Sequence, residues 1–275
     1  MLQIISDTGF IEGALRRQRL IVVASLVILV GLAWTYLFWG AGTGMSPLTM
    51  SNWQFPPQSS ASLARPSWNL TYAIVMLAMW WVMMIAMMVP GAAPMILLYS
   101  RTRARASSRG QSLSSLGATS LFVSGYLTVW FAFSVLATLA QYSLSALGIL
   151  DGVRMWSTSA GLSAAILVLA GTYQLLPAKA ACLEHCRSPV NYLASHFRSG
   201  NLGAWMMGLE HGAYCLGCCW ALMALLFVGG TMNLVWIAGL TILVLSEKLL
   251  ARGRWFERAI GFLLIATGLS VYAAA

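Results

Sequence analysis

The stretch that decides the fold is GAWMMGLEHGAYCLGCCWALMALLFVG, residues 203–229. It exceeds the roughly 20 apolar residues that a helix needs to cross a bilayer. Within it lie a carboxylate, an imidazole and three thiols: Glu210, His211, Cys215, Cys218 and Cys219. Ionisable groups inside a bilayer are costly, so they usually pair, bind a ligand or line a pathway. The stretch therefore predicts a membrane helix that carries a polar function.

The rest of the chain has the same character, with 59% hydrophobic and 8% charged residues. Long apolar runs with so few charges are typical of membrane helices. The sequence predicts an all-α fold, a polytopic integral membrane helix bundle of about seven transmembrane helices. The predicted spans are residues 20–39, 71–99, 117–147, 159–181, 203–229, 232–250 and 256–274.

The Lys and Arg residues predict the orientation, because cytoplasmic loops of membrane proteins are enriched in them. With a cytoplasmic N-terminus, two fall outside, Arg65 and Arg154, and fourteen fall inside. We expect a cytoplasmic segment at 1–19, a single transmembrane domain at 20–275 and an external loop at 40–70, where Gly and Pro break regular structure. The bias also explains the net charge of +9 without a nucleic-acid partner; the partner it indicates is the lipid bilayer. The fourteen are Arg16, Arg17, Arg19, Arg101, Arg103, Arg105, Arg109, Lys179, Arg187, Arg198, Lys248, Arg252, Arg254 and Arg258.

Helical spacing places His211, Cys215 and Cys218 on one face of the 203–229 helix, within a sector of roughly 60°. Thiolate and imidazole are ligands for copper(I) or zinc, and a metal would offset the cost of burying these groups. Glu210 lies on the flank of this face. Its role could be a metal ligand, a hydrogen-bond partner that orients the imidazole, or a proton carrier. Cys219 begins to turn away from this sector, so we expect it to serve packing.

A second group, Cys182-Leu183-Glu184-His185-Cys186, follows the fourth span. On a helix Cys182 and Cys186 share a face and His185 meets Cys182, so these three are candidate metal ligands. The alternative is a solvent-exposed helix end whose thiols do not bind a metal. A straight helix would separate Cys182 from Cys215 by nearly half the membrane thickness. The sequence leaves open two separate sites or a segment that folds inward to share one.

The second span carries a methionine face, with Met83 and Met87 as candidate copper(I) ligands. Pro90, Gly91 and Pro94 predict a kink there, and broken helices often mark transport pathways. The alternative for each methionine is packing, because Met fills irregular gaps in cores.

Several other polar residues receive simpler interpretations. Tyr173 and Gln174 precede Pro177 and are expected to hydrogen-bond across helices. Glu247 and Lys248 are expected to form a local pair at a cytoplasmic helix end or to extend their charged groups to the membrane surface. His196 and Arg198 are expected to be solvated loop residues.

The chain resembles a bacterial family of predicted metal-binding integral membrane proteins of uncharacterised function. The similar segments run from the second span to Leu250, and they include the pattern from Met83 to Met95, Tyr173 to Pro189, and Gly208 to Trp220. The resemblance implies a multi-pass protein of the bacterial inner membrane. It also implies Cys and His metal ligands at Cys182, His185, Cys186, His211, Cys215 and Cys218.

The leading hypothesis is copper(I) handling, by delivery to a cuproenzyme, storage or transport, with zinc or iron as other metals. One alternative is a membrane metalloenzyme that uses buried copper or iron for oxygen or electron chemistry, with Tyr214 or Trp220 nearby. Another is an accessory subunit of a larger membrane complex, with a structural metal. The sequence contains no Ser-His-Asp triad pattern, phosphate-binding loop or paired catalytic carboxylates.

Overall fold

The computed structural model describes residues 2–43, 51, 67–107, 115–152, 155–250 and 253–274. Most of the expected external loop at 40–70 lies outside these residues, as do Arg65, Arg109, Arg154 and Arg252. In the described part the chain folds into helices, and the only β pairing is an isolated bridge between Leu150 and Ser157. The all-α prediction is confirmed. The helices are α1 (Leu2–Phe38), α3 (Leu70–Ser107), α4 (Ser115–Ala146), α5 (Ala160–Leu175), α6 (Pro177–Arg187), α7 (Pro189–His196), α8 (Gly200–Ala224), α9 (Leu226–Gly229), α10 (Leu234–Leu249) and α11 (Trp255–Ala273).

Several of these helices are long and apolar enough to cross a membrane. The helical stretches that meet this criterion among the described residues are Arg16–Phe38, Leu70–Ala104, Ser115–Ala146, Gly200–Gly229 and Trp255–Ala273. The pair α5 and α6 meets it only jointly, because the two helices are bent by 66° at their junction. Helix α10 has 16 residues, fewer than the roughly 20 of a typical span. Because of the bend between α5 and α6, the expected span at 159–181 is not one straight helix.

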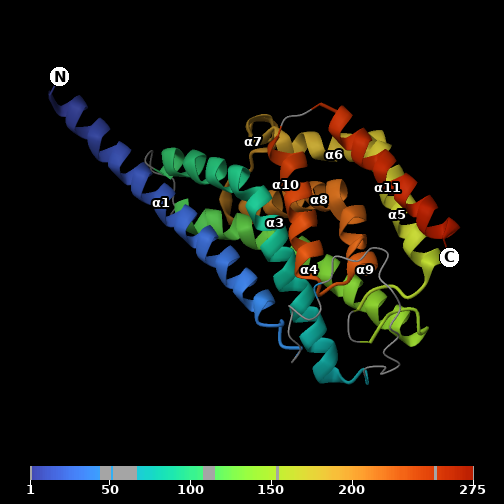
Figure 1. The fold of residues 1–275 in the computed structure, drawn as a ribbon. Helices are drawn as coiled ribbons and strands as arrows, with labels where there is room; N and C mark the ends of the chain where they lie inside the picture. Colours follow the sequence, from blue (N-terminus) through green and yellow to red (C-terminus); the bar gives the residue numbers. More distant parts are fainter. Residues whose placement is uncertain are drawn as a thin grey trace.

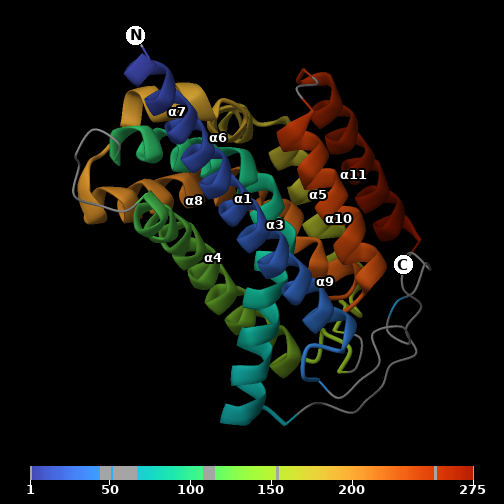
Figure 2. The same ribbon diagram turned by 90° about the vertical axis from the view of Figure 1, so that its left-hand side faces the viewer.

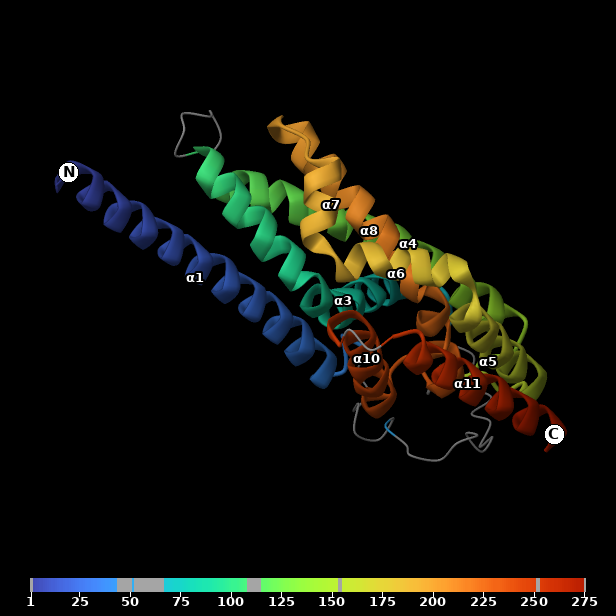
Figure 3. The same cartoon turned by 90° about the horizontal axis from the view of Figure 1, so that it is seen from above.

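The helices lie with their ends gathered at two sides of the molecule. The N-terminus, α6, α7 and the start of α11 lie at one side, and α9 and the start of α3 lie at the other (Figures 1 and 2). Seen from above, α1 and the pair α5–α11 lie at opposite edges, with α3, α6 and α8 between them (Figure 3). Successive long helices alternate in direction between these two sides (Figures 1 and 2).

Glycines let α4 and α8 touch backbone to backbone. A Cβ atom at Gly208 would lie 2.0 Å from the carbonyl oxygen of Phe122, and one at Gly125 would lie 2.2 Å from that of Trp205. Small residues at such positions are how membrane helices approach closely. The close approach brings Tyr126 of α4 alongside the cysteine face of α8.

Helix α3 bends partway along its length (Figure 1). It contains Pro90 and Pro94, and proline removes a backbone donor and clashes with the preceding turn. In the turn before Pro90 the hydroxyl of Tyr126 donates to the carbonyl of Met88, at 3.1 Å. A Cβ atom at Gly91 would lie 3.0 Å from the Cδ of Lys248, so the bend also makes room for that side chain.

Candidate metal centre

Three helices bring their polar side chains to one place inside the bundle. Helix α8 supplies Cys215, Cys218 and Cys219, all buried, and α6 supplies the half-buried Cys186. The third helix, α10, supplies Lys248, whose side chain is 5% exposed. We call these five residues the thiol cluster.

Helix α6 reaches the cluster because the helical path is interrupted before Pro177 and changes direction there. That residue is the first of α6, where proline is tolerated since no helical donor is lost. After the 66° bend α6 lies along α8, and Gly217 leaves room for Cys182, whose Sγ would be 2.9 Å from a Cβ atom there. The segment therefore folds inward, and the straight-helix separation of Cys182 from Cys215 was wrong.

The thiols contact one another and the backbone of α8. The thiol of Cys186 lies close enough to the thiols of Cys215 and Cys218 to interact with them electrostatically. The thiols of Cys218 and Cys219 both donate to the carbonyl of Cys215, at 3.1 and 2.9 Å. The thiol of Cys215 is also 3.1 Å from the hydroxyl of Tyr126.

Cys219 is part of this cluster. Its Sγ lies 3.8 Å from the Sδ of Met88, and its thiol contacts those of Cys215 and Cys218. The expected packing role fits this contact with Met88 of α3, but the side chain does not leave the cysteine face. Residues four apart on a helix are neighbours, so Cys219 stays beside Cys215.

Lys248 provides a buried positive charge at the cluster. Its Nζ donates to the Sγ of Cys215 at 2.9 Å. A positive charge beside a thiol favours the thiolate, which is the form that binds metals. The predicted local pair with Glu247 was wrong, since the two neighbouring side chains point to different partners.

Glu247 fixes the position of α6. Its Oε2 lies 2.6 Å from the Nζ of Lys179 and its Oε1 accepts from Gln174 at 2.8 Å. Lys179 also donates to Gln174, and the backbone carbonyl of Glu247 accepts from Arg187 at 2.8 Å. Arg187 in turn pairs with Glu257 of α11 at 2.7 Å. This network ties α5, α6, α10 and α11 together, and it confirms that Gln174 bonds across helices.

Tyr173 also bonds across helices, as predicted. Its hydroxyl donates to the carbonyl of Gly217. The bond joins α5 to α8 one residue before Cys218. It therefore holds the outer side of the cysteine face in place.

His211 lies next to the thiol cluster and is 2% exposed. Its Nδ1 is buried and has no hydrogen-bond partner. The rings of Phe122, Tyr126 and Tyr192 surround it, with centroids 6.0, 5.9 and 5.8 Å away. Burying such an atom unpaired is unfavourable, and a metal ion would satisfy it.

Glu210 and His185 point elsewhere. The Oε1 and Oε2 atoms of Glu210 lie 3.5 Å from the Nε2 of His196 and 3.5 Å from the Arg198 guanidinium. His196 and Arg198 are therefore partners of this carboxylate rather than simply solvated. His185 stacks on Tyr214 with centroids 4.0 Å apart, and its Nδ1 bonds the carbonyl of Ala181.

The methionine face of α3 is fully buried. Met83 and Met87 both have 0% exposure. The methionine that contacts the thiol cluster is Met88, which follows this face on α3 and lies against Cys219. In this arrangement no three His, Cys, Asp or Glu side chains of the described residues are grouped to hold a metal ion.

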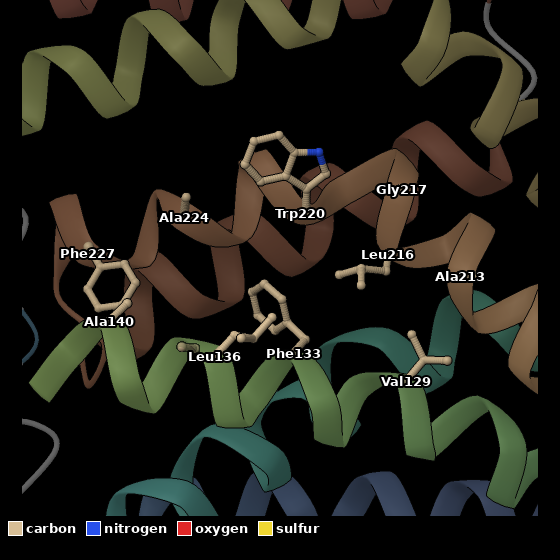
Figure 4. A pocket seen from close by; sticks show the side chains of 11 residues that line it. Val129, Phe133, Leu136, Ala140, Ala213, Leu216, Gly217, Trp220, Ala224 and Phe227 are labelled. Atoms are coloured by element: carbon tan, nitrogen blue, oxygen red, sulfur yellow. The ribbon is translucent and has the colours of Figure 1, made fainter. Parts of the chain in front are cut away.

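An apolar groove of about 560 Å³ lies beside the cluster, between α4 and α8. Val129, Phe133 and Leu136 line one wall, and Leu216, Gly217 and Trp220 line the other (Figure 4). The side chains facing the groove are apolar, and none of them is a cysteine (Figure 4). Such a groove suits a lipid chain better than a polar substrate.

Comparison with known families identifies the chain. The family model described as PpoB2, copper chaperone, matches residues 77–271, which is 195 of the 275 residues. The chain belongs to the PpoB2 copper chaperone family. Searches of curated proteins and of solved structures found no match. The family match includes every residue of the thiol cluster.

Sequence reasoning in this PpoB2 family member missed Lys248 of the cluster and Tyr126, whose hydroxyl contacts Cys215. The signal for Lys248 was a lysine at the end of an apolar run without an aspartate or glutamate one helical turn away. Tyr126 gave no signal, because aromatic residues are common throughout the spans.

Proposed function

We propose that this protein binds copper(I) inside the membrane, in the thiol cluster, and delivers it to a partner. The proposal rests on one observation: four thiols and a lysine ammonium gather in an apolar interior next to an unpaired imidazole nitrogen. Soft thiolate ligands select copper(I).

The charges of this arrangement balance when copper(I) is bound. Two thiolates and one copper(I) ion carry a net charge of −1, and the ammonium of Lys248 neutralises it. Uncompensated charge in a low-dielectric interior is costly, so neutrality favours binding. A divalent zinc ion with two thiolates and Lys248 would instead leave a net positive charge.

Loading requires a small rearrangement of the thiols. Cys218 and Cys219 donate to the carbonyl of Cys215 in this structure. Rotation about their Cα–Cβ bonds would free both sulfurs to bind metal beside Cys186 and Cys215. We assign Cys215 and Cys218 as the two thiolate ligands, with His211 completing the site and the uncharged thiols of Cys186 and Cys182 next to it. Glu210 and His185 are not part of this proposal.

The cellular setting extends the proposal. We place the protein in the bacterial inner membrane as a multi-pass protein with seven spans, α10 being the short sixth. Copper(I) would enter from the side of α6 and α7, and the receiver would be a cuproenzyme or another membrane-complex partner.

Elemental analysis of the full-length protein tests the copper site. The protein is purified in detergent under reducing, anaerobic conditions and supplied with copper(I). The Cys215→Ser, Cys218→Ser double variant replaces soft ligands with hard ones of similar size, so we expect a sharp loss of bound copper. Unchanged copper in this variant would refute the assignment.

Two controls separate ligation from folding. His185→Gln removes an imidazole that stacks outside the cluster, and we expect it to keep its copper. Circular dichroism and gel filtration of each variant show whether the helices and the monodisperse state survive. If only the His185→Gln variant loses copper, the copper site lies at His185 on α6 and not at the thiol cluster.

A further inference from the structure

A second group of sulfur atoms lies near the opposite end of the bundle. The amide Nε2 of Gln141 donates to the Sδ of Met76 at 3.4 Å and to the Sδ of Met155 at 3.3 Å. Met76 lies on α3 and Gln141 on α4, while Met155 is in the segment before α5. All three side chains are at most 2% exposed.

The orientation of the Gln141 amide is fixed by Trp80. The indole Nε1 of Trp80 donates to the Oε1 of Gln141 at 2.7 Å. The NH₂ group therefore faces the two sulfurs. Thioether sulfur is a weak acceptor, so the amide of Gln141 makes only weak hydrogen bonds through its NH₂ group. A cation in place of the NH₂ hydrogens would meet two soft ligands at once.

Met155 has an unfavourable backbone conformation at this position. Its φ of 55° lies in the left-handed region, which is unfavourable for a residue with a side chain. The hydroxyl of Thr231 also approaches its sulfur, at 3.5 Å. Backbone strain of this kind tends to occur at functional sites, where the fold holds a side chain in a required position.

Buried sulfur atoms connect this place to the thiol cluster. Met79, Met83, Met84, Met87 and Met88 follow Met76 along α3, and all have 0% exposure. Met88 contacts Cys219 of the cluster. The twelve residues from Met76 to Met88 correspond to about 18 Å of helix. The helix thus carries sulfur ligands from the thiol cluster towards the end of the bundle where α9 lies (Figure 2).

We propose that Met76 and Met155 form a second copper(I) site, from which the ion leaves the protein. The proposal deepens the proposed function and rests on it. With copper(I) bound, the amide of Gln141 would turn away and the two sulfurs would coordinate the ion.

The two sites would differ in strength. Thioethers are neutral, so a copper(I) ion at Met76 and Met155 keeps its full charge in an apolar interior. The thiol cluster holds the ion as thiolate with Lys248 as a counter-charge. Tight binding at the cluster and weaker binding at the methionine site is the order expected for uptake followed by release.

Copper(I) titration of the full-length protein in detergent tests the second site. We compare wild type with the Met76→Leu, Met155→Leu double variant, since Leu is close to Met in volume. We expect wild type to bind a tight and a weak equivalent, and the variant to lose only the weak one. The matched control is Met95→Leu, Met207→Leu, which removes two buried methionines elsewhere and should keep both equivalents.

The Cys215→Ser, Cys218→Ser variant separates the two proposals. It should lose the tight equivalent and keep the weak one, with X-ray absorption showing sulfur ligands at the copper that remains. If the methionine double variant binds both equivalents like wild type, the second site is refuted while the thiol site stands. If the serine variant also binds both equivalents, the proposed function fails as well.

A variant expected to bind copper more tightly distinguishes loss of a ligand from a folding defect. Gln141→Met places a third thioether where the amide now lies, so we expect the weak equivalent to bind at least threefold more tightly. Unchanged or weaker binding in a folded Gln141→Met protein would overturn the site.

Discussion

The ammonium group of Lys248 lies 2.9 Å from the sulfur of Cys215, although 33 residues separate them in the sequence. Neither group is accessible to solvent to any useful extent, so each is the other's main source of charge compensation. This pair places a positive charge beside the sulfur that the proposed function assigns to metal binding.

Replacing the lysine should weaken copper binding. Lys248→Met removes the charge that balances the two thiolates, and we expect the copper(I) affinity to fall by tenfold or more. Lys248→Arg keeps the charge and should retain much of the affinity. Competition with a coloured copper(I) chelator measures both, and Arg258→Met is the control because that residue is exposed. Equal affinities for Lys248→Met and wild type would contradict the charge argument.

Breaking the ion pair that anchors α6 should destabilise the protein. Lys179→Met leaves Glu247 buried without its cation, and losing one partner of a buried pair costs about 3–5 kcal/mol. The double variant Lys179→Met, Glu247→Gln should recover part of that loss. Thermal unfolding in detergent, followed by circular dichroism, measures both. A single variant that melts like wild type would show that the pair does not hold α6.

The contact between α4 and α8 should tolerate no side chain at Gly208. Gly208→Ala places a Cβ atom 2.0 Å from a backbone oxygen, so the helices must separate and the melting temperature should fall by several degrees. Gly239→Ala is the matched control, since nothing lies within 4 Å of its Cβ position on α10. Alanine favours a helix over glycine by about 1 kcal/mol, so this control should be neutral or slightly stabilising. Equal melting temperatures for the two variants would contradict the packing.

The methionine face of α3 should affect copper more than folding. The Met83→Leu, Met87→Leu double variant keeps the side-chain volume, so its stability should change by less than about 1.5 kcal/mol. Copper(I) affinity or transfer should nevertheless fall, because Leu has no sulfur. Thermal unfolding and copper competition are measured on the same sample. Unchanged copper handling would assign these two residues to packing.

The membrane topology is tested with reporter fusions. Lys179 and Lys248 are buried partners of Glu247 and Cys215, so they do not count as loop charges. Twelve Lys and Arg residues against two still favour a cytoplasmic N-terminus. A reporter after Ala275 should be active outside the cytoplasm and one after Ser107 inside it. Activity of the Ala275 fusion only in the cytoplasm would exclude seven spans.

The sequence by itself determined the features that depend on local periodicity. Apolar runs predict the long helices, and the helical repeat places His211, Cys215 and Cys218 on one face of α8. Pro90, Gly91 and Pro94 predict the bend of α3. These properties are fixed by residues within a few turns of one another.

Only the tertiary structure decided which distant groups meet. The bend after Leu176 brings Cys186 to the cysteines of α8, and the register of α10 directs Glu247 to Lys179 and Lys248 to Cys215. Helical spacing defines faces but not what lies opposite them, because rotation and translation of packed helices are set by side-chain volumes across the whole bundle. For the same reason Gln141 could be recognised in the sequence as a buried polar residue, while its place between Met76 and Met155 could not.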